Sequence, residues 1–120
     1  MAVSPSFKDF IAEQLDVVGP VSIRPMFGGA GVYSGDVMFA LIAYETLYLK
    51  ADATTSADFE AEGKEPFTYD GKAKPVQMSY WECPERLYDD PDEMKHWAEK
   101  ALAIAKRTKR PAKARKKKRP

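Results

Sequence analysis

The last fifteen residues of this 120-residue chain cannot build a hydrophobic core, so the fold must come from what precedes them. Residues 106–120 contain ten basic side chains and no acidic one, with only Thr, Ala and Pro between them. This composition buries too little apolar surface to offset chain entropy, so the sequence predicts a disordered basic tail over residues 106–120. The basic residues are Lys106, Arg107, Lys109, Arg110, Lys113, Arg115, Lys116, Lys117, Lys118 and Arg119.

Residues 1–105 form the predicted domain, and their charge is strongly acidic. The whole chain has 19 basic and 18 acidic residues, a formal net charge of +1. Without the ten tail cations, residues 1–105 hold nine basic and 18 acidic residues, a net charge of −9. Nucleic acid repels an acidic domain. We therefore expect any contact with nucleic acid to be made by the tail.

The composition excludes several classes of protein. Apolar residues make up 44% of the chain, enough for one core in a body of this size. A single cysteine, Cys83, and a single histidine, His96, exclude an internal disulfide and a Cys/His zinc site. No apolar run is long enough to span a membrane, and the first residues do not follow the pattern of a secretory signal. We therefore expect a cytoplasmic protein without a membrane partner.

The first half of the domain predicts one helix followed by four strands. Ser4 and Pro5 suit a helix N-cap and first turn. Apolar residues then recur at helical spacing until Gly19-Pro20 ends the helix. Beyond this stop, alternating apolar and polar residues predict an antiparallel meander. Its predicted parts are strands at Val21–Phe27, Val32-Tyr33, Val37–Tyr44 and Thr46–Lys50, with a glycine bend or bulge at Gly28–Gly31.

The second half predicts a short helix, a hairpin and a long helix. The short helix is expected over Asp52–Glu62, and the hairpin strands over Phe67–Tyr69 and Val76–Trp81, joined by a turn at Asp70-Gly71. Asp90-Pro91 suits the start of the last helix, which is expected to fray near Thr108. The order α-β-β-β-β-α-β-β-α predicts an α+β fold, a two-layer sandwich of an antiparallel sheet with helices packed on it.

An ordered set of motifs extends through most of the domain. The run Arg-Pro-Met-Phe-Gly-Gly-Ala-Gly at Arg24–Gly31 is followed by Phe39–Ile42, Leu47–Lys50, Pro66–Tyr69, Met78–Tyr80 and Trp97-Ala98. Together these motifs resemble the N-terminal domain of the TfoX/Sxy family, bacterial proteins associated with the regulation of natural competence. The resemblance extends over about Phe7–Ala105.

The resemblance implies a secretion-chaperone-like two-layer fold and a transcription-linked role without known catalytic chemistry. Full-length members carry a second, helical C-terminal domain, and this chain has only the basic tail in that place. The resemblance therefore carries over the fold better than a role in competence, and it supplies no catalytic residue to assign.

The glycine-rich run invites a phosphate-loop interpretation, which the sequence does not favour. A phosphate-binding glycine loop opens a helix, whereas strand residues follow Gly31. Arg24, beside the predicted bend, suits either an anion or an ion pair with an acidic side chain, and we favour the ion pair. A third hypothesis is a small-molecule pocket formed near Arg24, Gly28 and Gly29.

Other reactive residue types have simpler structural explanations. Cys83 lacks a strong local cause for a lowered thiol pKa and is expected to be a half-buried structural residue. His96 is expected at the surface of the last helix. The carboxylates near residue 90 suit the start of that helix better than a metal. We predict no catalytic residue, no metal site and no cofactor.

Aromatic residues near the second hairpin suggest a protein-binding surface. Tyr80 is expected in the core with Val76 and Met78. Tyr48, Tyr69 and Trp81 are expected on the opposite register and partly exposed, as contacts for a protein partner or a homodimer. The alternative is that helices cover that face too.

Taken together, these features predict a non-enzymatic regulatory module. Its tail is expected to bind nucleic-acid phosphates without sequence preference, because it has no framework to read base edges and no aromatic residue to stack on bases. The alternative function is a protein-binding, chaperone-like dimerisation module with no direct contact with DNA. A tail that lies on its own acidic body is a further alternative.

Overall fold

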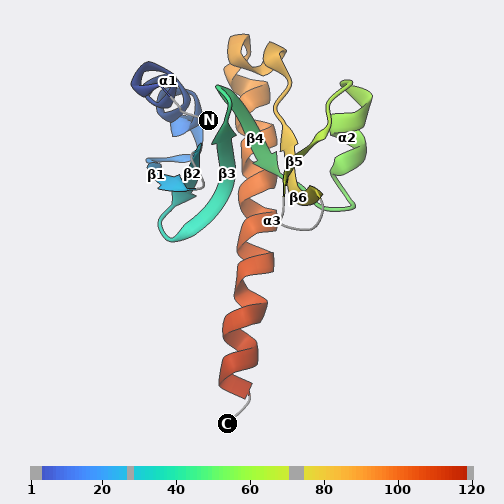
Figure 1. Ribbon diagram of the computed structural model, residues 1–120. Helices are drawn as coiled ribbons and strands as arrows, with labels where there is room; N and C mark the ends of the chain where they lie inside the picture. The colour runs from blue at the N-terminus through green and yellow to red at the C-terminus, as the bar shows by residue number, and fades with distance from the viewer. Residues whose placement is uncertain (1–3, 27–28, 71–74, 119–120) are drawn as a thin grey trace.

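A six-stranded antiparallel sheet with helices packed against it forms the domain (Figure 1). The computed structural model describes the backbone of residues 4–26, 29–70 and 75–118, and the side chains of these residues except at 26, 69–70, 75–78 and 109–118. The elements are α1 (Pro5–Leu15), the 3-10 turn η1 (Asp16–Val18), β1 (Ser22–Met26), β2 (Gly29–Ser34), β3 (Val37–Ala43), β4 (Thr46–Lys50), α2 (Ser56–Ala61), β5 (Pro66–Asp70), β6 (Pro75–Glu82), the 3-10 turn η2 (Glu85–Asp89) and α3 (Pro91–Lys118).

The strands lie in the order β1-β2-β3-β4-β6-β5, and each neighbouring pair is antiparallel. This arrangement confirms the predicted α+β class and the order of the main elements. Segment Gly29–Gly31, predicted as a bend, instead forms the first half of β2, between β1 and β3. Residue 28 lies outside the described part of the chain.

One face of the sheet carries the main core. Side chains from α1, α2 and α3 meet the strand residues of this face, and the shared apolar cluster includes Ile11, Phe59 and Met94. The strand residues alternate as expected of a half-covered sheet. Those that point toward the helices include Ala30, Val32, Ala40, Ile42, Leu47 and Leu49.

A bulge in β3 explains why this strand is apolar on both faces. Val32 lies opposite Ala40, but the next residue, Tyr33, lies opposite Met38, so Phe39 has no partner on β2. The extra residue shifts the alternation, and Phe39 and Ala40 both join the main core. Leu41 is therefore left for the other face of the sheet.

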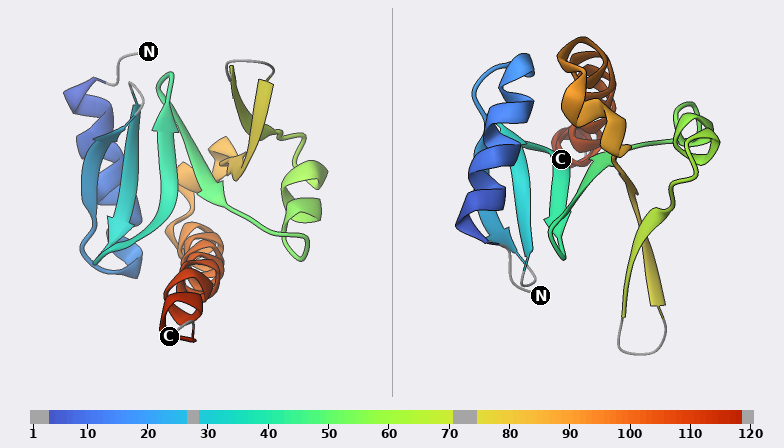
Figure 2. Two further views of the ribbon diagram at one scale, coloured as in Figure 1. Left: turned by 60° about the horizontal axis from the view of Figure 1, so that its bottom comes forward. Right: turned by 90° about the horizontal axis from the view of Figure 1, so that it is seen from above.

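The other face carries a second, smaller apolar cluster beneath the β5–β6 hairpin. It contains Leu41, Ala43, Phe67 and Tyr80, with Tyr48 half-buried beside them. The rings of Tyr48 and Phe67 lie edge to face, with centroids 5.0 Å apart. In Figure 2 (right) the hairpin projects away from α3.

The predicted grouping of the aromatic residues is wrong in one respect. Trp81 lies opposite Leu49, and Tyr48 lies opposite Glu82. Trp81 therefore packs against the main core, while Tyr48 shares the other face with Tyr80. The side chains of residues 69, 76 and 78 lie outside those the structure describes.

Both predicted helix starts are confirmed. Ser4 Oγ accepts a hydrogen bond from the backbone N–H of Phe7 at 3.2 Å, and Asp90 Oδ1 accepts one from the N–H of Glu93 at 3.2 Å. The carboxylate of Glu93, in the first turn of α3, accepts from Arg86 and from the Trp97 indole. The short helix predicted over Asp52–Glu62 is shorter in the structure. Helix α2 begins at Ser56, and Asp52 caps the turn before it.

Helix α3 continues well beyond the predicted fraying point at Thr108. Its backbone is helical to Lys118, and Figure 1 shows its C-terminal part projecting beyond the sheet. Disorder was expected for this segment. Ala, Lys and Arg have high helix propensities, which favours continuation despite Pro111.

Candidate functional site

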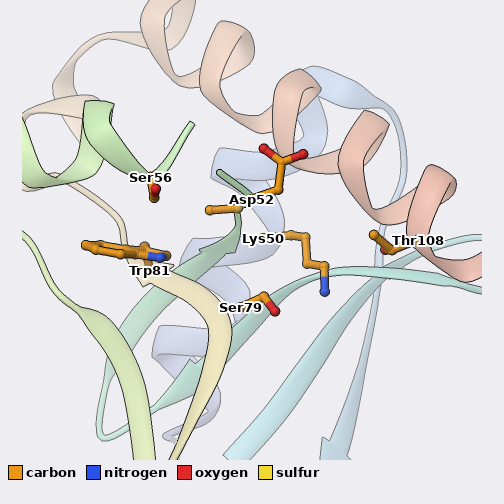
Figure 3. Close-up of a pocket in the computed structure, with 7 residues that line it drawn as sticks. Lys50, Asp52, Ser56, Ser79, Trp81 and Thr108 are labelled. Carbon is orange, nitrogen blue, oxygen red and sulfur yellow. The ribbon is translucent and has the colours of Figure 1, made fainter. Parts of the chain in front are cut away.

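A hollow of about 450 Å³ lies where the end of β4, the middle of β6 and α3 meet. Figure 3 shows it from close by. Its polar side chains come from β4, the loop after it, α2, β6 and α3, which form three separate stretches of the sequence. The lining residues are Lys50, Ala51, Asp52, Ser56, Ser79, Trp81 and Thr108.

The register of β4 and β6 determines which side chains reach this hollow. Leu49 faces the main core, so the next residue, Lys50, extends to the other face and lies opposite Tyr80. Pairing continues one residue beyond β4, where the Ala51 N–H donates to the carbonyl of Ser79 at 2.9 Å. The chain then leaves the sheet at Asp52.

Lys50 is a half-buried cation. Its Nζ lies 5.0 Å from the centroid of the Tyr80 ring, a cation–π distance. Burial lowers the pKa of Lys50 from its usual value, and the nearby Asp52 charge partly opposes this effect. Among the residues that the structure describes, none forms a hydrogen bond or an ion pair with its ammonium.

Asp52, in contrast, has its carboxylate fully engaged. Oδ1 accepts from the Thr54 backbone N–H at 2.9 Å and from the Thr54 hydroxyl at 2.6 Å. Oδ2 accepts from the Arg107 guanidinium at 2.7 Å. The Thr54 hydroxyl is the largest cause that lowers the pKa of Asp52, and the Arg107 charge adds to it. In Figure 3 the Asp52 carboxylate points toward α3, away from the Lys50 ammonium.

Trp81 forms an aromatic wall of the hollow. It is half-buried, and its ring packs beside Phe59 with centroids 6.1 Å apart. Figure 3 places its indole across the hollow from Thr108. The Trp97 indole N–H donates to Glu93, but Trp81 makes no comparable bond within the described part of the chain.

A second hollow of about 350 Å³ adjoins the first. Lys50 and Thr108 line both hollows, so Lys50 stands between them. The second hollow also brings Tyr33 and Tyr80, from the sheet face opposite the main core, close to α3. The Thr108 hydroxyl donates back to carbonyls of α3, at 3.0 Å from Ile104 and 3.2 Å from Ala105.

The comparison with known families covers all the residues that line the two hollows except Thr108. The family described as the TfoX N-terminal domain matches residues 13–105. The chain belongs to this family. The DNA transformation protein TfoX1 of Aliivibrio fischeri is 31% identical over 74 residues, which are 62% of this chain and 35% of that protein. The chain thus spans about a third of the length of this relative.

In this TfoX N-terminal domain, the predicted contact residues do not form one site. Arg24 and Tyr33 lie on the sheet face opposite the main core, near the β1 edge, where the Arg24 guanidinium lies 4.4 Å from the centroid of the Tyr33 ring. The ion pairs between described residues do not include Arg24. Gly29 lies inside β2, Tyr48 packs on Phe67, and only Trp81 reaches the hollow beside Lys50. The side chain of Tyr69 and the whole of Gly28 lie outside the described residues.

Of the predicted tail cations, only the first two, Lys106 and Arg107, have side chains that the structure describes. The side chains of Lys106 and Arg107 are exposed, and Arg107 is bound to Asp52. The side chains of residues 109–119 lie outside those described, although the backbone is helical as far as Lys118.

The reactive residue types behave as structural groups. Cys83 is buried, and burial raises the pKa of its thiol to about 12, far from the range of a reactive thiol. Asp90 serves as an N-cap, and His96 lies exposed on α3. Across residues 4–26, 29–70 and 75–118, no three His, Cys, Asp or Glu side chains are grouped to hold a metal. No helix in those ranges is both long and apolar enough to cross a membrane.

Lys50 and Thr108 were not predicted from the sequence as site residues. Lys50 ends an alternating strand and Thr108 follows the last apolar residues of α3, so each resembled an ordinary surface position. The alternation of Leu47 and Leu49 was enough to place Lys50 on the opposite face. Its proximity to Thr108 depends on how α3 docks, which no local pattern reports.

Proposed function

We propose that this chain is a non-enzymatic, cytoplasmic regulatory module linked to competence and transcription, with a basic segment that binds nucleic acid without sequence preference. The observation that carries the proposal is the charge division along the chain. Residues 1–105 have a net charge of −9, and residues 106–120 add ten cations. The family membership, and the name of the relative as a DNA transformation protein, agree with this role.

The direction of α3 supports separate roles for the acidic domain and the basic segment. The helix packs on the sheet through Met94, Ala98 and Ala101, and then continues past the sheet (Figure 1). The helical part of the basic segment, 106–118, is about 20 Å long at 1.5 Å per residue. The backbone of this segment thereby extends beyond the sheet, which supports a role for its cations in contacts with phosphates.

Binding of this kind depends on counterion release. Each phosphate neutralised by a cation contributes roughly 0.9 to the slope of log affinity against log salt on duplex DNA. If about half of the ten tail cations engage, the slope is expected to be roughly −4 to −5. Affinity should vary little between duplex sequences of the same length, because phosphates carry no direct sequence information.

A titration of duplex DNA at several salt concentrations tests the proposal. The full chain is compared with a variant in which Lys109, Lys113, Lys116, Lys117 and Lys118 are replaced by Gln. Arg107 is kept, because it binds Asp52. The variant should lose affinity and have a shallower salt slope. A control with Lys8→Gln and Lys95→Gln, on α1 and α3, should behave as the full chain. Equal affinity and slope for the tail variant would contradict the proposal.

The sheet face opposite the main core favours a second candidate function, protein binding or dimerisation without contact with DNA. The observation that supports this candidate is that Tyr48 lies only half-buried at the border of the small apolar cluster that contains Tyr80 and Phe67. Light scattering of the full chain and of Tyr48→Glu distinguishes the two functions. A dimer that Tyr48→Glu dissociates supports this candidate, and a monomer at all concentrations removes its basis.

A further inference from the structure

We infer that the basic segment of one copy of this chain docks on an acidic face of a second copy, so that copies associate head to tail. The face is formed by α1 and the turn η2, and we call it the α1–η2 face. It consists of Phe10 and the exposed carboxylates Asp9, Glu13, Asp16, Glu85 and Asp89. The inference concerns contacts between copies, and it does not depend on whether the segment binds nucleic acid.

The outer side of α1 carries three of these carboxylates. Asp9, Glu13 and Asp16 are separated by four and three residues, so they follow one another along one side of the helix. All three are exposed, whereas Ile11 and Leu15, on the other side of α1, are buried in the main core. The outer side of α1 is therefore an unpartnered helix face in a single copy.

The turn η2 extends this face. The ring of Tyr88 lies edge to face against Phe10, with centroids 5.1 Å apart, and the side-chain amide of Gln14 donates to the Tyr88 carbonyl at 3.4 Å. These two contacts place η2 beside α1. Glu85 and Asp89 belong to η2, and both are exposed. The carboxylates of the two elements therefore lie on neighbouring parts of the surface.

No contact within the described residues accounts for these five carboxylates. The ion pairs there involve other acidic side chains, and so do the side-chain hydrogen bonds. Like charges four or three residues apart on a helix repel. Glu13 and Asp16 also stand at the C-terminal end of α1, where the helix dipole disfavours acidic groups and no basic residue compensates. A cationic partner would relieve this unfavourable arrangement.

The basic segment of a second copy has the complementary charge. Residues 106–120 contain ten basic side chains and no acidic one. The segment is helical to Lys118, so its helical part is a rod of about 20 Å, close to the length of about 16 Å of the 11-residue helix α1. Phe10 is 36% exposed, and aromatic rings bind both the cationic heads and the alkyl stems of Lys and Arg. The α1–η2 face thus offers carboxylates and an aromatic ring to a segment that carries only cations and small residues.

The segment cannot reach the face of its own copy. Helix α3 begins at Pro91, two residues after Asp89, and is continuous to Lys118. Lys106 therefore lies about 22 Å along the helix from Pro91, and the segment continues away from that point. Figure 1 shows α1 at the upper end of the molecule and the C-terminal part of α3 at the lower end. Since the face and the segment are different surfaces, their contact is heterologous and joins copies in a row.

Two complementary variants test the inference by light scattering. The first, Asp9→Asn, Glu13→Gln and Asp89→Asn, lacks most of the acidic face. The second is the Gln variant of the five tail lysines, which lacks most of the segment charge. Each variant alone should be monomeric, and an equimolar mixture should form a heterodimer, because one supplies the segment and the other the face. The full chain should associate at about 50 mM salt and dissociate at about 300 mM, where exposed charges are screened.

A matched control separates the position of the charges from their number. Glu60→Gln, Glu65→Gln and Glu99→Gln change the net charge by the same amount at exposed side chains outside the α1–η2 face. This control should associate as the full chain does, whereas the acidic-face variant should associate about tenfold or more weakly. Urea denaturation should show that the acidic-face variant is no less stable than the full chain, because it removes repulsion on α1.

Several results would overturn the inference. They are a full chain that is monomeric at low salt, undiminished association of either complementary variant alone, and the absence of a heterodimer in the mixture. Association that only Tyr48→Glu abolishes would assign the contact to the second candidate function instead.

Duplex DNA separates this inference from the proposed function. The acidic-face variant keeps every tail cation, so it should bind duplex DNA with the affinity and salt slope of the full chain. Intact DNA binding without a heterodimer would refute the head-to-tail contact alone. A heterodimer without DNA binding by the full chain would refute the proposed function alone.

Discussion

The Arg107 guanidinium lies 2.7 Å from the carboxylate of Asp52, and this contact fastens the start of the basic segment to the loop after β4. The two residues are 55 positions apart in sequence. The contact ties α3 to the body at the point where the helix leaves the sheet. It also neutralises the acidic group beside Lys50.

Replacement of Asp52 should loosen the end of α3 before it affects the rest of the domain. In Asp52→Asn the charge on Arg107 loses its partner, while the amide oxygen still accepts from Thr54. We expect faster amide hydrogen exchange at residues 104–108 and a small, salt-dependent loss of stability, because the pair is exposed. Asp58→Asn, which removes the longer 3.7 Å contact with Lys100, is the control. Unchanged exchange at residues 104–108 would show that the pair does not hold the helix.

A methyl group at Gly29 should destabilise the sheet. A Cβ there would lie 2.3 Å from the carbonyl oxygen of Ile42, which belongs to the neighbouring strand β3. Backbone must move to accept it, so Gly29→Ala is expected to cost about 1–3 kcal/mol in the free energy of unfolding. Urea denaturation measures the change, with Ser22→Ala on the exposed side of β1 as control. A loss in Gly29→Ala no larger than that of the control would contradict the close approach.

The turn between β3 and β4 should be stabilised by a different residue at position 44. Tyr44 and Glu45 both have left-handed backbone angles, with φ of 53° and 58°. A bulky residue is strained there, whereas Asn tolerates this conformation well. Because Tyr44 is 65% exposed, little burial is lost. Tyr44→Asn should therefore raise the free energy of unfolding by about 1 kcal/mol.

Two control variants separate backbone strain from side-chain contacts in this turn. Tyr44→Phe keeps the strain and should leave stability unchanged. Glu45→Ala should lower stability, because the Glu45 carboxylate accepts from the Ser4 backbone N–H at 2.7 Å and from its hydroxyl at 2.9 Å. A gain in Tyr44→Phe equal to that of Tyr44→Asn would point to the side chain instead.

Stability should fall as the pH rises above about 9. Burial raises the pKa of the Cys83 thiol to about 12 and that of Tyr80 to about 12, from ordinary values of 9.0 and 10.0. Between pH 9 and 12 the unfolded chain loses the Cys83 proton while the folded chain keeps it. The folded state then binds more protons, so the free energy of unfolding decreases with pH, by up to about 1.4 kcal/mol per pH unit for one group.

Urea denaturation at pH 8, 9 and 10 measures this dependence. In Cys83→Ala the decrease between pH 9 and 10 should be largely absent, since Tyr80 contributes only above its ordinary value of 10.0. A flat profile for the full chain, or the same slope in both proteins, would contradict the assignment to Cys83.

Local signals explain why much of the fold was predictable. Ser4-Pro5 and Asp90-Pro91 begin their helices because capping depends on residues within one turn. The alternation in Thr46–Lys50 reports that Leu47 and Leu49 share a face, and both are buried in the main core. The same signals did not predict where α3 ends. In this segment the high helix propensity favours a helix, whereas the low apolar content favours disorder.

The candidate site was predicted only in part, because it depends on register between strands. Tyr80 and Trp81 were correctly placed on opposite faces of β6, but the partner of each on β4 was not available from either strand alone. Pairing of Leu49 with Trp81 moves Trp81 to the helix side and leaves Tyr48 beside Tyr80. A shift of one residue would have reversed this result.

The sequence by itself determined the order of the elements, the α+β class and the division between an acidic domain and a basic segment. These properties depend on periodicity and composition, which act over a few neighbouring residues. Only the tertiary structure decided that Phe39 joins the core through a bulge and that Lys50 and Trp81 share a hollow with Thr108. The physical reason is that strand register and helix docking are selected by the packing of the whole core, and not by any single segment.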